Sequence, residues 1–372
     1  MTSGEKVTVI FPLYNTEETV PNLVDALMAQ KRSGFQSQSE WLNAIFVDDA
    51  SKDQTLNNVK TELSKRGNPK HIHVVENPEN MGLSKSLNKA FGHAETEFVV
   101  TCQCDCLFAT ENFVSNMFDL ISKRNDVAAI TGQPKVDFSR PIPFAERVNL
   151  VANLMDLFPE VTSEQLIPVG FAEGRCDIFR ISAFKEVDFY DTNLKIAGED
   201  QVMSRRLRGA GYEICQAPNN PYFLSASNEQ NSIMKLVTHQ HLFGKTQPYI
   251  LFASSGTQLS GIIGDKAGAN RSLRSILRGS QILIGISYIL AILIGFFTGA
   301  WAGLFGLLLL ASIFKFAIFN KHLSLVPMDI VEKIKFFALL PILDIAYALG
   351  FIEGCYLLVK RLFQKKGMEE QI

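Results

Sequence analysis

The sequence predicts an α/β fold with a mostly parallel, doubly wound central sheet, followed by a C-terminal α-helical membrane segment. Two observations carry this prediction. Strand-like and helix-like runs alternate from Val7 to about residue 130, which is typical of parallel sheets covered by helices. No residue between Arg278 and Lys315 is charged, although 20% of the whole chain is.

The alternating region begins with Val7–Leu13, a short apolar run that predicts a buried first strand. The run Glu17–Gln30 follows with apolar residues at helical spacing. Further strands are predicted at Ala44–Val47, His71–Val75 and Glu97–Cys102, and further helices at Leu56–Lys65 and Leu83–His93.

Polar clusters follow these predicted strands. Tyr14 comes after the first strand, Asp48 and Asp49 after the second, and Asp105 after the fourth. In open α/β sheets, ligands bind beyond the carboxyl ends of the strands. The sequence therefore predicts a binding crevice at that edge, although each residue alone is as well explained as a cap or turn residue.

The residue types in this crevice suit a nucleotide diphosphate. Asp105 could hold a hard divalent cation, and the Tyr14 ring offers a face for base stacking. Lys85 could neutralise phosphate charge, while Glu199 and Asp200 offer a base for a hydroxyl.

Composition excludes other classes of site. The net charge of -2 lacks the excess of positive charge that is typical of nucleic-acid-binding proteins. The six cysteines suit a reducing compartment. Cys102, Cys104 and Cys106 alternate without the two-residue gap of a zinc knuckle, so we expect small buried packing residues rather than metal ligands.

The uncharged stretch before Lys315 predicts a hairpin of two short spans, because one helix crosses a bilayer in about 20 residues. Its turn is placed at Thr298–Trp301. A buried helical pair in a large soluble protein is the alternative. The N-terminus lacks a secretory pattern, so we expect an integral protein of the cell membrane with its catalytic domain in the cytosol.

A third apolar segment, Phe336–Val359, is interrupted by Pro341, Asp344 and Glu353 and has basic residues on both sides. A single crossing would place one basic cluster on the non-cytosolic side. The pattern therefore favours an interfacial or re-entrant pair of helices, and a third full span is the alternative.

At this point a family resemblance is visible. The stretches "VTVIFPLYNTEETV", "FVDDASKDQT", "NPENMGLSKSLNKA", "QCDC", "FRISAF" and "GEDQVMSRRLRGAGY" occur in that order between residues 7 and 214. As an ordered set they resemble the family 2 glycosyltransferases, inverting enzymes with the GT-A fold, some of which carry C-terminal membrane helices.

The resemblance implies roles for individual residues. Asp200 matches the presumed catalytic base, with Glu199 beside it, and Asp105 matches the second acid of the family's D-x-D metal motif. The implied cofactor is a divalent cation, Mn²⁺ or Mg²⁺. The residues implied to bind the donor are Pro12, Tyr14, Glu17, Asp48, Asp49, Gly82, Lys85, Asn88, Gln103 and Arg206.

One departure from the motif concerns the metal. Gln103 stands where the family has the first acid of D-x-D, so the site lacks one negative charge. The family often adds a later metal ligand or phosphate-binding residue, and His239 or His241 is a candidate, with His241 taken as the metal ligand. A histidine in a helix is more often structural.

The expected activity is transfer of a sugar from a nucleotide-diphosphate sugar to a hydroxyl acceptor, a lipid-linked or other glycan, beside membrane lipids. Two alternatives remain: a polyprenyl-phosphate sugar synthase, and an inactive adaptor that only binds nucleotide sugars. The expected domains are 1–230 for the GT-A part, 231–279 for a basic helical linker, 280–319 for the hairpin, and 320–372 for the third segment with a basic tail.

Overall fold

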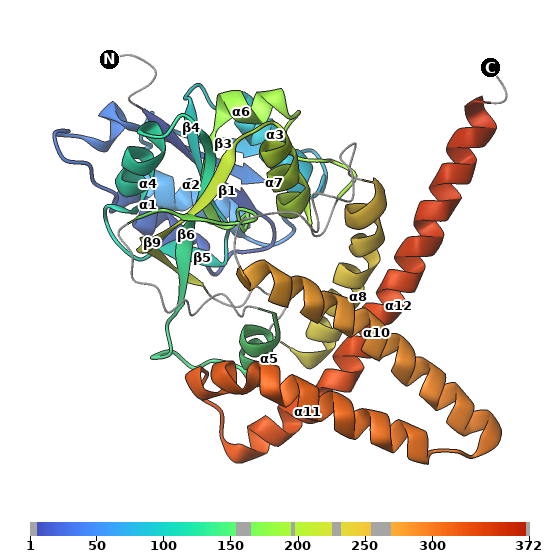
Figure 1. Ribbon diagram of the computed structural model, residues 1–372. Coiled ribbons are helices and arrows are strands. Elements are labelled where there is room, and N and C mark those ends of the chain that lie inside the picture. Colours follow the sequence, from blue (N-terminus) through green and yellow to red (C-terminus); the bar gives the residue numbers. More distant parts are fainter. Residues whose placement is uncertain (1–5, 154–164, 195–197, 225–231, 254–268, 370–372) are drawn as a thin grey trace. The chain divides into compact units, whose positions relative to one another are not determined.

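The computed structural model describes residues 6–153, 165–194, 198–224, 232–253 and 269–369 (Figure 1). The chain divides into two compact units. The α/β unit comprises Met1–Asp137 and Leu157–Ser227, and the helical unit comprises Phe138–Asp156 and Asn228–Ile372. The predicted boundary at residue 230 lies near the end of the α/β unit, but the segment 138–156 groups with the C-terminal helices.

The α/β unit is built on a nine-stranded sheet with the order β3-β2-β1-β4-β8-β6-β9-β5, and β7 pairs with β9. The first four strands in this order are mutually parallel, whereas β8 lies antiparallel between β4 and β6. The strands are β1 Val7–Leu13, β2 Leu42–Asp48, β3 Ile72–Glu76, β4 Phe98–Cys102, β5 Cys106–Phe108, β6 Val127–Val136, β7 Ile167–Pro168, β8 Cys176–Arg180 and β9 Glu213–Leu224.

Helices complete the α/β unit, and their apolar sides face the sheet. In α3, Leu87 and Phe91 are buried and join a core cluster that includes Ile10, Val99 and Phe179. The predicted α/β fold is confirmed. The helices are α1 Val20–Met28, η2 Gln38–Glu40, α2 Thr55–Lys65, α3 Leu83–His93, α4 Phe113–Ser122, α6 Ile181–Glu186 and α7 Glu199–Gly209.

Among its described residues, the helical unit contains three helices that are long and apolar enough to cross a membrane, with candidate spans Ser280–Thr298, Ala302–Asn320 and Ile330–Lys360. The first two are joined by a tight turn, as predicted, in which the amide of Gly299 donates to the Gly295 carbonyl (Figure 1). The helices of this unit are α5 Phe144–Asn153, α8 Ile233–Pro248, the π-helical turn η4 Tyr249–Ala253, α10 Ala269–Thr298, α11 Ala302–Leu325 and α12 Ile330–Glu369.

The third apolar segment differs from the favoured expectation of two interfacial or re-entrant helices. It forms one continuous helix, α12, with Pro341 inside it. Each of the two acids in this segment is paired with a cation of another helix. Asp344 pairs with Lys315 of α11 at 2.5 Å, and Glu353 pairs with Lys245 of α8 at 2.5 Å.

Glycines bring α8 and α12 into close backbone contact. A Cβ at Gly350 would overlap the His241 carbonyl, and one at Gly354 would overlap the Lys245 carbonyl. Small residues four apart permit this kind of approach between helices. The contact fixes the position of α8, which carries the predicted histidines, against α12.

Candidate active site

The crevice begins where β1 and β2 end. The amide of Asp49 donates to the Leu13 carbonyl at 2.9 Å, which joins the two strand ends. Asn15 and Ala50 have positive φ angles of 48° and 57° in the turns that follow. Non-glycine residues rarely adopt this conformation, and strained residues of this kind cluster at functional sites.

The two adjacent acids at the end of β2 have different surroundings. Both carboxyl oxygens of Asp49 are engaged, because Oδ1 accepts from the Met81 amide at 2.8 Å and Oδ2 from the Gly82 amide at 2.9 Å. Asp48 Oδ2 accepts from the Ser51 amide at 3.1 Å, but its buried Oδ1 has no hydrogen-bond partner among the residues that the structure describes. Asp48 is thus the acid with a spare acceptor for a nucleobase N–H or a ribose hydroxyl.

The other predicted residues near these turns are a mixture of open and engaged side chains. Tyr14 is 39% exposed, which leaves its ring open to stacking. Glu17 accepts from the Gln54 amide at 2.8 Å, and Pro12 is buried within β1. Lys85 is exposed in the first turn of α3.

Gly82 and Asn88 have structural roles near the crevice. Gly82 has φ 84° at the start of α3, where glycine has no steric penalty. The Asn88 amide group donates to the Tyr190 carbonyl at 2.9 Å and accepts from the Tyr190 amide at 3.1 Å. Asn88 therefore anchors the segment around Tyr190 in this structure.

The turn after β4 carries the residues of the altered metal motif. The Gln103 backbone N–H donates to the Arg175 carbonyl at 3.0 Å, and the Gln103 side chain donates through Nε2 to the Gly174 carbonyl. Asp105 is partly buried, and its Oδ1 accepts from the Cys106 thiol at 3.3 Å. Gln103 is thus held against the loop 172–175.

Helix α7 presents the predicted base. Gly198, with φ 92°, caps its N-terminus, and Glu199 and Asp200 lie in its first turn. Glu199 is buried, which raises its pKa. Asp200 is partly exposed, and its Oδ1 accepts from the Gln201 amide at 2.7 Å. Because it remains accessible, Asp200 is the better placed of the two to take a proton from a substrate.

The loop 172–175 connects the metal-motif turn with α7. A Cβ at Gly174 would lie 3.4 Å from Asp200 Cβ, 3.8 Å from Gln103 Nε2 and 3.9 Å from Glu199 Oε1. Gly174 itself has φ 70°. Gln103 and Asp200, 97 positions apart by subtraction of their numbers, therefore converge on one place.

Arg206, also on α7, pairs with Asp191 at 3.2 Å. This ion pair joins α7 to the segment that Asn88 anchors. The arginine therefore supports the shape of the crevice wall in this structure.

The two predicted metal ligands belong to different units. His241 lies in the helical unit and approaches Glu353 at 3.2 Å, and Asp105 lies in the α/β unit. Within the described ranges, no three His, Cys, Asp or Glu side chains could hold a metal ion together. Asp105 still fits a Mg²⁺-type ion, which is commonly bound by one or two carboxylates together with substrate phosphates.

Two charged residues of the loop and strand beyond Gly174 were missed by sequence reasoning. Arg175 is close enough to feel the charges of Glu173 and Asp105, and its buried Nη1 has no hydrogen-bond partner in the described part of the chain. Asp177 is fully buried in β8. The available signal was the stretch "EGRCD", which places three charges next to an apolar strand.

The cysteines are packing residues, as expected. Cys102 and Cys106 are buried, and the thiol of Cys102 lies 3.5 Å from that of Cys176 across the β4–β8 pair. Cys104 is less buried, and desolvation raises the pKa of its thiol to about 12. The Cys104 thiol is therefore protonated at neutral pH.

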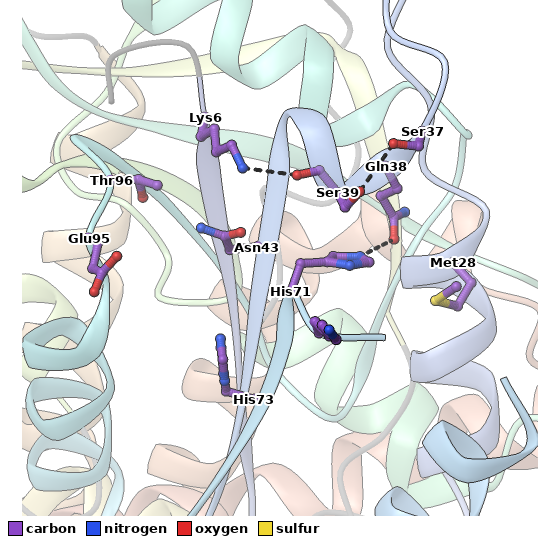
Figure 2. A pocket seen from close by; sticks show the side chains of 11 residues that line it. Lys6, Met28, Ser37, Gln38, Ser39, Asn43, His71, His73, Glu95 and Thr96 are labelled. Carbon is purple, nitrogen blue, oxygen red and sulfur yellow. Dashed lines mark hydrogen bonds between the residues drawn. The ribbon is translucent and has the colours of Figure 1, made fainter. Parts of the chain in front are cut away.

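A cavity of about 750 Å³ lies elsewhere, at the amino ends of β1, β2, β3 and β4 (Figure 2). Lys6 and His71 line it, but their side chains are already bonded to Ser39 and Gln38. Because β1 and β2 are parallel, this cavity lies at the end of the strands opposite to Asp48. It is distinct from the crevice.

Comparison with known proteins gives matches of different extent. The model of the family "Glycosyl transferase family 2" matches residues 8–188. "Putative glycosyltransferase EpsE" of Bacillus subtilis (strain 168) is 32% identical over 99 residues, which are 27% of this chain and 32% of that protein. "Undecaprenyl-phosphate 4-deoxy-4-formamido-L-arabinose transferase" of Proteus mirabilis (strain HI4320) is 28% identical over 100 residues, 27% of this chain and 29% of that protein. The chain thus spans about a third of the length of these two relatives.

Among solved structures, the fold is similar to that of mannosyltransferase PcManGT from Pyrobaculum calidifontis, which was determined in complex with GDP-Man and Mn²⁺. The TM-score is 0.57 at 16% identity, and the match covers 94% of this chain and 87% of the other. At this identity the likeness concerns the fold.

Proposed function

This chain belongs to glycosyl transferase family 2 through its residues 8–188, and on that premise we propose that it is a membrane-anchored inverting glycosyltransferase. It moves a sugar from a nucleotide-diphosphate sugar to an acceptor hydroxyl. The observation that carries the proposal is the convergence at Gly174, which puts the motif residue Gln103 and the base Asp200 beside the same glycine.

In this proposal the donor lies across the strand ends. Its base stacks on Tyr14, and Asp48 Oδ1 accepts a hydrogen bond from the base or ribose, since that oxygen is buried and unpaired among the described residues. Asp49 holds the 81–82 turn in place through its amide hydrogen bonds. The diphosphate lies toward Asp105 and Arg175.

Asp200 takes the proton from the acceptor hydroxyl. The acceptor oxygen then forms a bond to the anomeric carbon as the bond to the diphosphate oxygen breaks, which inverts the configuration. Arg175 and Lys85 offset the negative charge that the leaving diphosphate gains. A divalent cation, when bound by Asp105 and the diphosphate, supplies further stabilisation of that charge.

The three apolar helices favour an acceptor at the membrane. They are long enough to span it, and a reactive group on a lipid stays near the headgroups, where a tethered enzyme meets it at a raised effective concentration. We place the α/β unit on the cytosolic face, and the acceptor is a lipid-linked glycan.

A second candidate function is synthesis of a polyprenyl-phosphate sugar. The relative from Proteus mirabilis, named for an undecaprenyl-phosphate substrate, favours it. A phosphate acceptor is already ionised and needs no general base, so Asp200 would be dispensable for that reaction.

A donor panel tests the function. We expect the purified full-length protein, in nanodiscs that contain lipid-linked saccharide acceptors, to release nucleoside diphosphate from one class of nucleotide sugar. Addition of a chelator should stop the release and Mn²⁺ or Mg²⁺ should restore it, because without a cation the Asp105 carboxylate repels the leaving diphosphate, and Arg175 and Lys85 offset only part of its charge. Binding of nucleotide sugars without release from any member of the panel would instead support the inactive adaptor.

A further inference from the structure

A row of buried polar side chains crosses three strands beneath the crevice. Asp177 of β8 is directly opposite Thr101 of β4 on one side and Thr131 of β6 on the other. All three are nearly or completely buried, with exposures of 0%, 1% and 2%. Direct cross-strand partners point to the same face of a sheet, so the carboxyl lies between two hydroxyls.

This row is only partly hydrogen-bonded. Asp177 Oδ2 accepts from the Gly174 amide at 2.6 Å. Asp177 Oδ1, Thr101 Oγ1 and Thr131 Oγ1 make no geometrically good hydrogen bond within the described residues. An apolar residue at position 177 would remove the unpaired oxygen, whose burial is destabilising, but it would leave the Gly174 amide without this acceptor. The reason for a carboxyl here must then lie in the hydrogen bond that it accepts.

The Gly174 amide supplies that reason, because loop 172–175 joins both sides of the crevice. The Gly174 carbonyl accepts from Gln103 Nε2, and the Ala172 amide donates to Ser204 Oγ of α7 at 3.1 Å. Gly174 also lies in contact range of Asp200 Cβ. The hydrogen bond from Gly174 to Asp177 ties this loop to the rigid centre of the sheet.

We propose that Asp177 is a positioning residue, which holds loop 172–175 through the Gly174 amide and so sets the position of Gln103 relative to Asp200. The inference rests on the proposed function of that site. Asp177 itself lies beneath the loop and contacts neither donor nor acceptor.

The protonation state of Asp177 supports this role. Burial, together with the nearby Glu173 charge, raises its pKa to about 7, although the Gly174 and Arg175 amides oppose the shift. Glu173 is the charged group that acts directly on Asp177, and Tyr190 lies close enough to feel the charges of Asp177, Glu199 and Asp200. A protonated carboxyl can donate to one of the threonine hydroxyls while its other oxygen still accepts from Gly174.

The sign of the pH effect follows from this shift. The folded pKa of about 7 exceeds the usual value of 3.8, so stability is complete at low pH and is lost as the pH rises toward 7. We expect the melting temperature of the wild-type protein to fall between pH 5 and pH 7.5, and the fall to be smaller in Asp177→Asn, which cannot ionise.

Two variants separate positioning from general stability. Asp177→Val removes the acceptor for Gly174, and we expect kcat to fall about 10-fold to 100-fold, with KM for the donor changed less than about threefold, since small misplacements of reacting groups have effects of this size. Asp177→Asn keeps an acceptor for Gly174 and should recover most of that loss. Hydrogen–deuterium exchange of the peptide that covers 170–178 should be faster in Asp177→Val and close to wild type in Asp177→Asn.

Thr8→Val is the matched control, because it removes a buried hydroxyl from the same sheet, where Thr8 bonds Thr96 at 2.8 Å, away from the loop. It should change neither exchange in 170–178 nor the kcat. Unchanged exchange and unchanged kcat in Asp177→Val would overturn the inference. If no donor is turned over even by the wild-type protein, the proposed function fails, but the exchange and melting measurements still decide the role of Asp177. If Asp177→Val does not fold, the melting of Asp177→Asn still tests the inference. A melting temperature that depends on pH in Asp177→Asn as it does in the wild-type protein would contradict the buried, protonated carboxyl on which the role depends.

Discussion

Asp200→Asn is expected to lower the turnover of nucleotide sugar by about 10² to 10⁴-fold, the usual contribution of a general base, while the affinity for nucleoside diphosphate stays within about twofold. The amide has the same shape as the carboxyl, so the hydrogen bond from the Gln201 amide can persist. What is lost is the ability to take a proton. Initial rates of diphosphate release and calorimetric titration with the diphosphate product measure the two quantities separately.

Asp126→Asn is a suitable control, because Asp126 is an exposed partner of Arg124 on the surface and should affect neither quantity. Full turnover by Asp200→Asn with a lipid phosphate as the acceptor would support the polyprenyl-phosphate sugar synthase. Loss of diphosphate binding would assign Asp200 to donor binding instead.

Lys315→Leu and Asp344→Leu are each expected to destabilise the protein by about 3–5 kcal/mol, the usual cost of leaving one member of a buried ion pair alone. The side chains are only 4% and 0% exposed, and they meet between α11 and α12. Both helices contain candidate membrane spans, where an uncompensated charge has no water to solvate it.

The double variant, with leucine at both positions, should recover most of the lost stability, because no charge remains buried. Thermal denaturation of the detergent-solubilised full chain measures all three variants. Lys335→Leu, at an exposed position of α12, is the control and should change little. If the single variants were as stable as the double variant, the pair would have no role in joining α11 to α12.

The sequence predicted those parts of the site that depend on parallel strand ends. The run Val7–Leu13 became β1 with the same limits, and the strand-end rule then placed Tyr14, Asp48 and Asp49 at one edge. The nucleotide-diphosphate site predicted at that edge rested on residue type and order alone. The apolar hairpin could also be predicted, because a run of about 20 uncharged residues per span can be read directly from the sequence.

Asp177 and Arg175 could not be found in the same way. Their roles depend on β8, which enters the sheet antiparallel between β4 and β6, and no local pattern predicts which strands a distant segment will join. The continuity of α12 was missed for a similar reason. Asp344 and Glu353 interrupt the apolar pattern, and their cations, Lys315 and Lys245, come from other helices.

The most direct measurement of the central claim is an experimental structure of the full chain with the nucleoside diphosphate of its preferred donor bound. We predict that the base lies against Tyr14 with a hydrogen bond to Asp48, and that the diphosphate lies between Asp105 and Arg175. A nucleotide bound instead in the cavity beside Lys6 and His71 (Figure 2), with the strand-end crevice empty, would contradict the account.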